Sequence, residues 1–357
     1  MSTKNLIVKV IVQDSSGYLT TTNVTVVEKS NEPVVAGGYY VSGNGDMRAD
    51  TTGQGMNLKS FTQYRSLADG NTFPGYSKEY LRDYISKGIW GNFVLELKAY
   101  GGTITGPQTF AVEGKTYTVP VPNMTIQQRS GQTWPKAYGY EQVTSGKIDG
   151  LLHRAAAQLK AMPVGKINVQ LASEFDTDHE FGITENSVAY TWEQADTRAL
   201  SALNYMLDYF KAYGIGSNVT FTIGMAGFNR AAFKRMHPES IMPKIGYLHF
   251  NAYRRSASQT ALDIFKRTKV WSDADLGPMA KAKDIIVAEW GTPMSLNDQA
   301  AFIKTVPAAI KKLNEESTTG KFVMTNYFNS NDGWGTLSPR QTGLDALKTA
   351  YLTEPYV

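Results

Sequence analysis

The chain has 357 residues, of which 42% are hydrophobic and 19% are charged, and its formal net charge is +4. This composition is typical of a folded globular protein; Lys and Arg are scattered, so no nucleic-acid partner is expected, and no apolar run is long enough for a membrane span. Cysteine is absent and the four histidines do not lie at metal-ligand spacing, so thiol chemistry is excluded and neither a metal nor a cofactor is expected.

The first 32 residues differ from the rest of the chain. LIVKVIVQ (6–13) and TTNVTVVEK (21–29) are β-rich and the turn DSSG lies between them, which predicts a hairpin. No apolar region followed by a small-residue cleavage site opens the chain, so no signal peptide is expected. We therefore expect an N-terminal β extension at 1–32 and a main domain at 33–357.

Short apolar strands alternate with longer amphipathic helices from about Pro33 onward, which is typical of βαβ units and a parallel sheet. Eight strands predict a (β/α)8 TIM barrel, and a doubly wound open sheet is the main alternative. The candidate strands are VVAGGYY (34–40), LKSFTQY (58–64), FVLELKAY (93–100), INVQLASE (167–174), VTFTIGM (219–225), IGYLHFN (245–251), IIVAEW (285–290) and FVMTNYF (322–328).

Helices are expected near 148–162 and 297–315, and a third is marked at both ends. Thr191 and Gln194 form a capping-box pattern, and Gly214 stands where a helix would end. The stretch 101–146 is too long for a plain loop after the third strand. It contains TFAVEGKTYTVPVP, which predicts a β-hairpin insertion that shapes the active-site face.

Strand parity makes Glu174 a candidate for chemistry. Alternate residues of INVQLASE face the helices, and the others, Asn168, Gln170, Ala172 and Glu174, face the barrel interior. Glu174 ends the strand, where barrel enzymes keep their catalytic groups. The same alternation places Tyr247, His249, Asn251 and Tyr253 on an inner polar stripe. Asn168 and Tyr247, low in the barrel, are expected to be satisfied core groups, whereas Tyr253 ends its strand and is a site candidate.

Glu289 is the second candidate acid. It ends the buried strand of KDIIVAEWGTP, where a glutamate is costly unless it has a function or pairs with an interior cation. Two carboxylates at strand ends of one barrel are what glycoside hydrolysis requires, one as acid/base and one as nucleophile. Asp176, Asp178 and Glu180 compete with Glu174 for the acid role, and Glu180 is the first replacement. Glu96 with Lys98 fits an interior ion pair.

The segments SGKIDGLLHRAAAQLKAMPVGKINVQLASEFD, MHPESIMPKIGYLHFNAYR, KDIIVAEWG and FVMTNYFN together resemble glycoside hydrolase family 26, a family of retaining (β/α)8 glycosidases. The resemblance runs from about Val34 to Trp334. It implies that Glu174 is the acid/base, that Glu289 is the nucleophile, and that Tyr253 hydrogen-bonds and orients Glu289.

The chain departs from the family pattern around the acid. The family carries Arg-x-x-x-Glu with His before the Glu, where this chain has Gln170 and Ser173, and the family's Met-Asn-Gly is Phe175-Asp176-Thr177 here. The resemblance therefore does not carry mannan over as the substrate. The aromatic residues Trp290 and Trp334 either stack on a sugar or plug the core. The expected substrate-binding residues are Ser173, Asp176, His179, Tyr39, Trp290, Phe328, Asn329 and Trp334.

We expect a retaining endo-β-glycoside hydrolase that cleaves a polysaccharide, either mannan-like or a bacterial capsular or exopolysaccharide. Extracellular action without a signal peptide points to a phage virion, with the N-terminal extension attaching the enzyme to the virion or forming a homo-oligomer. The alternatives are a non-catalytic glycan-binding barrel and a phage tail receptor-binding protein. Two acids at strand ends favour the enzyme, because a binding module has little need of the pair.

Overall fold

The computed structural model describes residues 5–13, 19–27, 34–40, 58–68, 79–97, 106–121, 124–127, 133–177, 184–185, 188–328 and 342–357. The chain divides into two compact units, Met1–Pro33 and Val34–Val357. In the first unit, β1 (Asn5–Gln13) pairs antiparallel with β2 (Leu19–Val27), with Asn5 opposite Val27 and Gln13 opposite Leu19.

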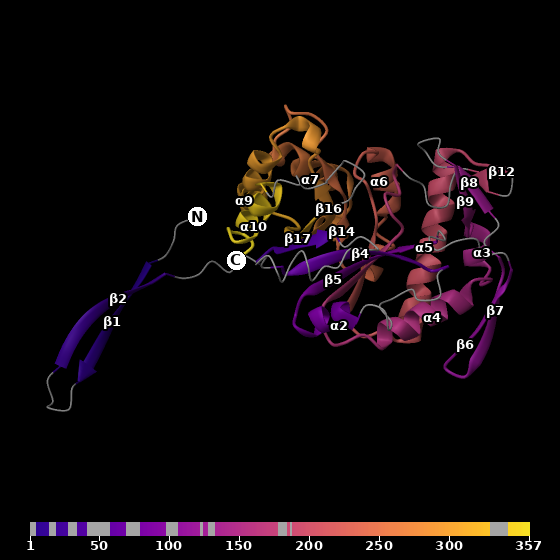
Figure 1. Cartoon of the computed structure of the whole chain (residues 1–357), viewed down its shortest axis with the longest axis horizontal. Helices are drawn as coiled ribbons and strands as arrows, with labels where there is room; N and C mark the ends of the chain where they lie inside the picture. The colour runs from indigo at the N-terminus through magenta and orange to yellow at the C-terminus, as the bar shows by residue number, and fades with distance from the viewer. Residues whose placement is uncertain are drawn as a thin grey trace. The chain divides into compact units, whose positions relative to one another are not determined.

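The second unit is built on a nearly closed barrel of parallel strands (Figure 1). This architecture confirms the predicted (β/α)8 TIM barrel over an open doubly wound sheet. In barrel order the strands are β3 (Ala36–Tyr40), β4 (Ser60–Ser66), β5 (Trp90–Glu96), β10 (Ile167–Leu171), β13 (Val219–Ile223), β14 (Leu248–His249) with its continuation β15 (Ala252–Tyr253), β16 (Ile285–Gly291) and β17 (Phe322–Tyr327).

The barrel closes between β13 and β14 by two backbone hydrogen bonds instead of a continuous ladder. Gly246 N–H donates to the Phe221 carbonyl at 2.8 Å, and Asn251 N–H donates to the Met225 carbonyl at 3.0 Å. All the other neighbouring strands of the barrel are joined by parallel ladders.

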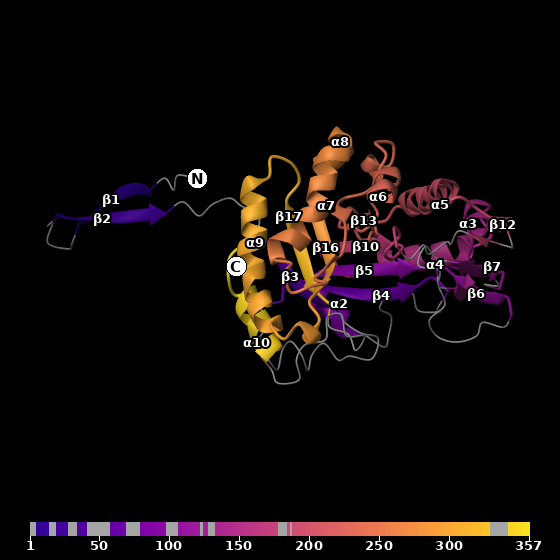
Figure 2. The same cartoon turned by 90° about the horizontal axis from the view of Figure 1, so that it is seen from above.

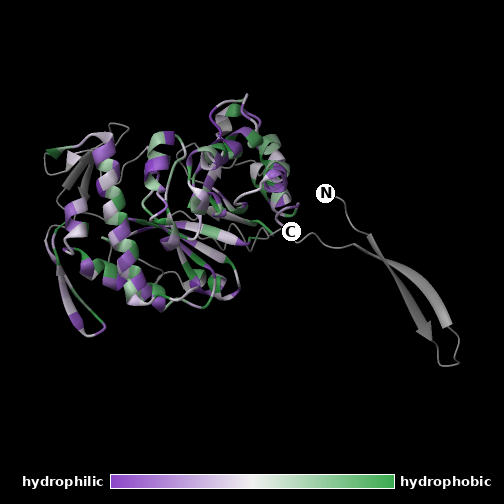
Figure 3. Ribbon diagram, turned by 180° about the vertical axis from the view of Figure 1, so that it is seen from behind, coloured by the Kyte–Doolittle hydropathy of each residue, from purple (hydrophilic) through white to green (hydrophobic). Residues whose placement is uncertain are grey.

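Helices alternate with the barrel strands and cover them. They are α2 (Glu79–Ser86), α3 (Tyr140–Thr144), α4 (Asp149–Lys160), α5 (Trp192–Tyr213), α6 (Arg230–Met236), α7 (Ala261–Asp275), α8 (Pro278–Lys281), α9 (Gln299–Glu316) and α10 (Thr342–Tyr351). Short 3₁₀ turns lie at η2 (Met242–Lys244) and η3 (Met294–Leu296). The long helices carry both hydrophobic and hydrophilic residues (Figure 3), and α9 lies beside α10 (Figures 1 and 2). Among the described helices, none has the length and apolar character needed to span a bilayer.

The predicted ends of α5 are confirmed. Thr191 and Gln194 exchange the two hydrogen bonds of a capping box, which satisfies backbone N–H groups that the first turn leaves free. Gly214 ends the helix in the left-handed conformation, with φ 79°. A β-branched or bulky residue would be strained there, so the residues at its two ends set where this helix begins and ends.

The region after β5 contains β6 (Gln108–Val112) and β7 (Lys115–Val119), which pair antiparallel around a turn in which Glu113 and Gly114 both have positive φ. Tyr117 packs this hairpin against His153 of α4, with ring centroids 5.1 Å apart. Two further strand pairs are β8 (Met124–Gln127) with β9 (Thr133–Ala137), and β11 (Thr184–Glu185) with β12 (Val188–Ala189).

The interior of the barrel holds a layer of hydrogen-bonded polar side chains. Asn168 Nδ2 donates to Asn92 Oδ1 at 2.7 Å and to Thr222 Oγ1 at 3.1 Å, and Asn326 Nδ2 donates to Thr62 Oγ1 at 2.7 Å. All five side chains are buried. Because buried polar groups are tolerated when they are paired, this layer confirms the interpretation of Asn168 as a satisfied core residue.

Candidate active site

A tight loop after β10 positions Glu174. The strand ends at Leu171, and both Ala172 and Glu174 then adopt positive φ, 63° and 44°. Phe175 N–H donates to the Gly224 carbonyl at 2.9 Å, which fastens the loop to the end of β13. The expectation that strand alternation carries Glu174 to the interior is therefore wrong. A left-handed turn, a strained conformation for residues other than glycine, brings it to the site instead.

Glu289 lies within β16 and is 3% exposed. The pairing of β16 with β17 shifts between Val287 and Trp290, so Glu289 sits in an irregular part of the ladder. The Ala288 carbonyl there accepts a hydrogen bond from Thr62 Oγ1 at 3.0 Å, across the barrel from β4. Such irregularities re-aim a side chain, and this one directs Glu289 toward the open end of the barrel.

Asn251 bridges the two glutamates. Its Nδ2 donates to Glu174 Oε1 at 2.9 Å and to Glu289 Oε2 at 3.2 Å. The two acceptor oxygens can therefore lie no farther apart than these two bonds laid end to end. That limit is below the roughly 6.5–9.5 Å between the carboxyl groups of inverting glycosidases.

Two tyrosines complete the surroundings of Glu289. Tyr253 donates to its Oε2 at 2.8 Å, so the predicted hydrogen bond is confirmed. Tyr64 of β4 donates to its Oε1, and the Tyr64 hydroxyl also lies 3.3 Å from Ser173 Oγ. With Asn251, three donors, one from β4 and two from the β14–β15 segment, hold both oxygens of Glu289. Hydrogen bonds to a carboxylate favour its charged form, which a nucleophile requires.

Neither Tyr64 nor a role for Asn251 was predicted from the sequence. Asn251 was placed on the inner polar stripe, and its position two residues before Tyr253 on the same face was a usable signal. Tyr64 ends the segment LKSFTQY, and only the barrel neighbours of β4 could show that it reaches Glu289.

His249, one step below Asn251 on the stripe, belongs to the core. It is fully buried, and its Nδ1 accepts the Met225 N–H at 3.0 Å. Burial lowers the pKa of its imidazole to about 3, so the ring is neutral at physiological pH. Tyr247 packs against Trp90 at the lower end of the barrel, with ring centroids 5.2 Å apart and the rings tilted by 58°.

Asp176 is not a substrate-binding residue of the kind expected. Its carboxylate is 2% exposed and accepts four backbone N–H groups, those of residues 226–229, at 2.5 to 3.3 Å. Both oxygens are occupied, so Asp176 organises the loop between β13 and α6. This loop is thereby tied to the segment that carries Glu174.

Trp290 is not a sugar-stacking platform. Its side chain is fully buried and packs edge-on against Tyr327 at 4.7 Å and Phe265 at 6.1 Å, which leaves it no face for a ligand. Phe328 is half-buried and meets the Tyr253 ring at 5.8 Å, beside Glu289. Ser173 lies in the site, because its Oγ is 3.3 Å from the Tyr64 hydroxyl that contacts Glu289.

Several expected residues lie outside the described part of the chain. They are His179, Asn329 and Trp334, the competing acids Asp178 and Glu180, and Lys98, the expected partner of buried Glu96. Tyr39 lies in β3, but its side chain is also outside the description. Within the described residues, no group of three or more His, Asp and Glu side chains could hold a metal ion.

No family model matches the chain, and no curated protein matches it in sequence. Solved structures match its fold at low identity. GH26C from Muricauda sp. has a TM-score of 0.58 and 11% identity, over 91% of this chain and 87% of that chain. The YdhT protein from Bacillus subtilis has a TM-score of 0.56 and 11% identity, over 90% and 85%.

The Bacillus subtilis mannanase BCman has a TM-score of 0.54 and 12% identity, over 89% of this chain and 85% of that chain. A family 39 glycoside hydrolase from Bacteroides cellulosilyticus has a TM-score of 0.52 and 12% identity, over 96% and 69%. The structural neighbours of this barrel thus include family 26 mannanases and a related glycosidase, with which it shares the fold.

Proposed function

We propose that this protein is a retaining glycoside hydrolase that cleaves a polysaccharide, with Glu289 as nucleophile and Glu174 as acid/base. The observation that supports the proposal most is the single Asn251 donor shared by both carboxylates. A pair this close leaves no room for the water that an inverting enzyme places between its acids. The glycosidase neighbours make the same chemistry plausible for the fold.

The surroundings of each acid suit its proposed role. Glu289, held by three donors, attacks the anomeric carbon as the glycosidic bond breaks, and Glu174, more accessible, protonates the departing oxygen. Glu174 then removes a proton from the water that hydrolyses the glycosyl-enzyme. Loss of the nucleophile's charge in the first step removes an electrostatic obstacle to that second role.

The proposed substrate is a β-linked polysaccharide cut within the chain. Two of the neighbours named above are a mannanase and GH26C, and mannan-like polymers are therefore one candidate. Bacterial capsular and exopolysaccharides are the other, because Ser173 and Phe175 replace the residues that the family carries beside the acid. We also propose a place on a virion outside the cell, with unit Met1–Pro33 as the attachment element.

The proposal is tested by incubating the purified protein with mannan, mixed-linkage glucan, xylan and bacterial capsules and measuring new reducing ends. We expect at least one polymer to be cut by the natural protein and left intact by Glu289→Gln. Binding of a glycan without cleavage by the natural protein would instead indicate a glycan-binding barrel. Cleavage that persists in Glu289→Gln would remove the proposed nucleophile.

A further inference from the structure

Two arginines meet one aromatic ring at the end of the barrel that holds the glutamates. The guanidinium carbons of Arg255 and Arg267 lie 3.8 and 4.3 Å from the centroid of Phe228. Phe228 is in the loop after β13, and Arg255 follows β15 by two residues. Arg267 reaches the same ring from α7. Each contact is well within the range of a cation–π interaction.

The guanidinium of Arg267 is only partly paired. Its Nε and Nη2 are buried, and among the described residues neither has a hydrogen-bond partner. Burial lowers the pKa of its guanidinium, the charge of Arg255 acts in the same direction, and the charge of Asp176 opposes both. Asp176 makes no bond to Arg267, because its oxygens already hold the backbone of residues 226–229.

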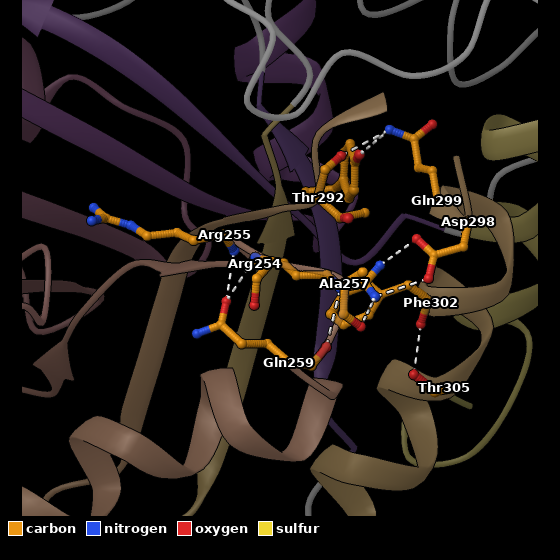
Figure 4. A network of polar contacts seen from close by, with 11 residues as sticks. Arg254, Arg255, Ala257, Gln259, Thr292, Asp298, Gln299, Phe302 and Thr305 are labelled. Carbon is orange, nitrogen blue, oxygen red and sulfur yellow. Dashed lines mark hydrogen bonds and ion pairs between the residues drawn. The ribbon is translucent and has the colours of Figure 1, made fainter. Parts of the chain in front are cut away.

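Hydrogen bonds of Arg254 and Gln259 fix the loop that carries Arg255. Arg254 forms two hydrogen bonds with Asp298 and also donates to the carbonyls of Ala257 and Gln259. The Gln259 side chain accepts the Arg255 N–H at 2.7 Å. Figure 4 shows this network, from which the Arg255 side chain extends away. The loop is therefore fixed while its outer arginine stays exposed.

This cluster lies close to the proposed acid/base. Phe228 N–H donates to Asp176 Oδ2 at 2.7 Å. Asp176 is two residues from Glu174, so their Cα atoms are at most about 7.6 Å apart. A polysaccharide that places its scissile bond at Glu174 extends over several sugar rings, and a neighbouring ring falls within reach of the arginines.

We propose that Arg267, with Arg255, binds the carboxylate of an acidic sugar residue next to the cleaved bond, so that the substrate is an anionic polysaccharide. The inference rests on the proposed function and names its substrate class. Arginine suits this task because its planar guanidinium donates hydrogen bonds to a carboxylate while its face rests on an aromatic ring. Arg255 is exposed and can donate to the carboxylate, whose negative charge would offset the repulsion between the two guanidinium groups that meet at Phe228.

The test measures binding by calorimetry in the Glu289→Gln background, so that no substrate is consumed. The ligands are hyaluronan, oligogalacturonate, alginate and oligosialate oligosaccharides, each beside a form whose carboxyl groups are reduced to alcohols. We expect at least one acidic ligand to bind ten-fold or more tightly than its reduced form. Arg267→Met, which keeps an unbranched side chain and removes the charge, should remove that preference and leave binding of the reduced form unchanged.

Arg230→Met is the matched control. Arg230 is a nearby arginine of α6 that already forms two hydrogen bonds with Asp275, so its loss should leave the preference intact. The comparison of acidic and reduced ligands needs no arginine variant and remains valid if Arg267→Met fails to fold.

Equal binding of acidic and reduced ligands, or no binding of any acidic ligand, would overturn the inference. Binding of inorganic phosphate at Arg267 without any oligosaccharide would also overturn the assignment to a sugar. Cleavage of neutral polymers alone would leave the proposed hydrolase standing and remove the acidic subsite. A preference for acidic ligands without cleavage by the natural protein would leave the acidic subsite standing and remove the proposed hydrolase.

Discussion

Asn251 joins the two halves of the proposed mechanism because one amide group serves both acids. Two carboxylates placed together repel each other, and a shared neutral donor reduces the cost of keeping them close. Asn251 donates to Glu174 Oε1 by a bond separate from its bond to Glu289. We therefore expect it to keep the proposed base oriented when Glu289 is part of the glycosyl-enzyme.

The two acids should differ in how their loss affects different leaving groups. Glu289→Gln is expected to abolish cleavage of every substrate, because an amide cannot form the glycosyl-enzyme. Glu174→Gln should be most impaired on substrates whose leaving group needs a proton. On an aryl glycoside with a good leaving group it should still form the intermediate, and added azide should speed its breakdown, as measured by steady-state kinetics and product analysis.

An active Glu289→Gln enzyme would contradict this division. So would a Glu174→Gln enzyme that is equally poor on both leaving groups and insensitive to azide. Full activity in both variants would move the chemistry elsewhere, with Glu180 the next residue to replace.

Tyr253→Phe should lower kcat by about 10- to 100-fold, the effect of one hydrogen bond to a charged group, while the fold is kept. The reason is the 2.8 Å bond from its hydroxyl to Glu289 Oε2. Tyr247→Phe, the same change at the lower end of the barrel, is the matched control and should leave kcat unchanged. Unchanged turnover in Tyr253→Phe would remove its role in orienting the nucleophile.

At the scale of single residues, the sequence predicted which strands carry the acids but not which neighbours support them. Tyr253 ends its strand as expected, whereas Glu289 was expected at a strand end and lies two residues before the end of β16. Asp176 and Trp290 look like site residues in the sequence but are buried in the structure. Residues 226–229 cover Asp176 and Tyr327 packs on Trp290, and these contacts between distant segments cannot be seen in the sequence. Tyr64 reaches Glu289 across the barrel, and no local pattern reports such a contact.

Strands β10, β13, β16 and β17 begin at the residue predicted from the sequence, and the clearest exception is a strand whose start depends on its neighbours. The capping box at Thr191 and the left-handed Gly214 bound α5 without help from the rest of the fold. The third strand was expected at 93–100 but runs over Trp90–Glu96. Gly91 and Asn92 form strands poorly on their own, and here they are held between β4 and β10 on both sides.

Two buried histidines should make stability depend on pH. Burial lowers the pKa of His237, after α6, to about 4 and that of His249 in β14 to about 3, from 6.5 for an exposed imidazole. Between pH 6.5 and 4 the unfolded chain therefore binds more protons than the folded one. Their contribution to stability is complete above pH 6.5 and is lost as the pH falls, by up to about 1.4 kcal/mol per pH unit for each histidine.

The measurement is the free energy of unfolding of the natural protein and of His237→Gln and His249→Gln between pH 7 and pH 4.5. Each variant should lose less stability over this range than the natural protein does. His153→Gln changes a histidine of α4 whose side chain is only partly buried and serves as the control. Equal pH slopes in all four proteins would show that the buried imidazoles do not set the acid sensitivity.

At the scale of the whole molecule, the two units differ in what stabilises them. The barrel unit has its own core, whereas the first unit is a two-stranded hairpin that pairs Leu6 with Val26 and Val8 with Val24. An isolated hairpin is at best marginally stable in water. The first unit is therefore expected to need a partner, and a second copy of the same hairpin is the simplest one to test.

A protein that begins at Val34 should fold, unfold at nearly the same temperature and keep its activity per active site. Light scattering should show a smaller assembly than that of the full chain. The control is the full chain with Val8→Thr and Val24→Thr, which keeps the length and β propensity of the strands while reducing their apolar character. A truncated protein with the same mass per assembly as the full chain would show that this unit does not mediate association.

The incomplete ladder between β13 and β14 affects where the barrel opens locally. Regions with few backbone hydrogen bonds open at lower free energy than the rest of a fold, and amide exchange with solvent reports such opening. The amides of Gly246 and Asn251 make the backbone hydrogen bonds across this gap, so we expect them to exchange sooner than the amides of β5, which is paired on both sides. Asn251 also holds both glutamates. The part of the barrel that is expected to open first is thus the part that aligns the two acids. A bound substrate that contacts both β13 and β14 would therefore be expected to slow amide exchange there.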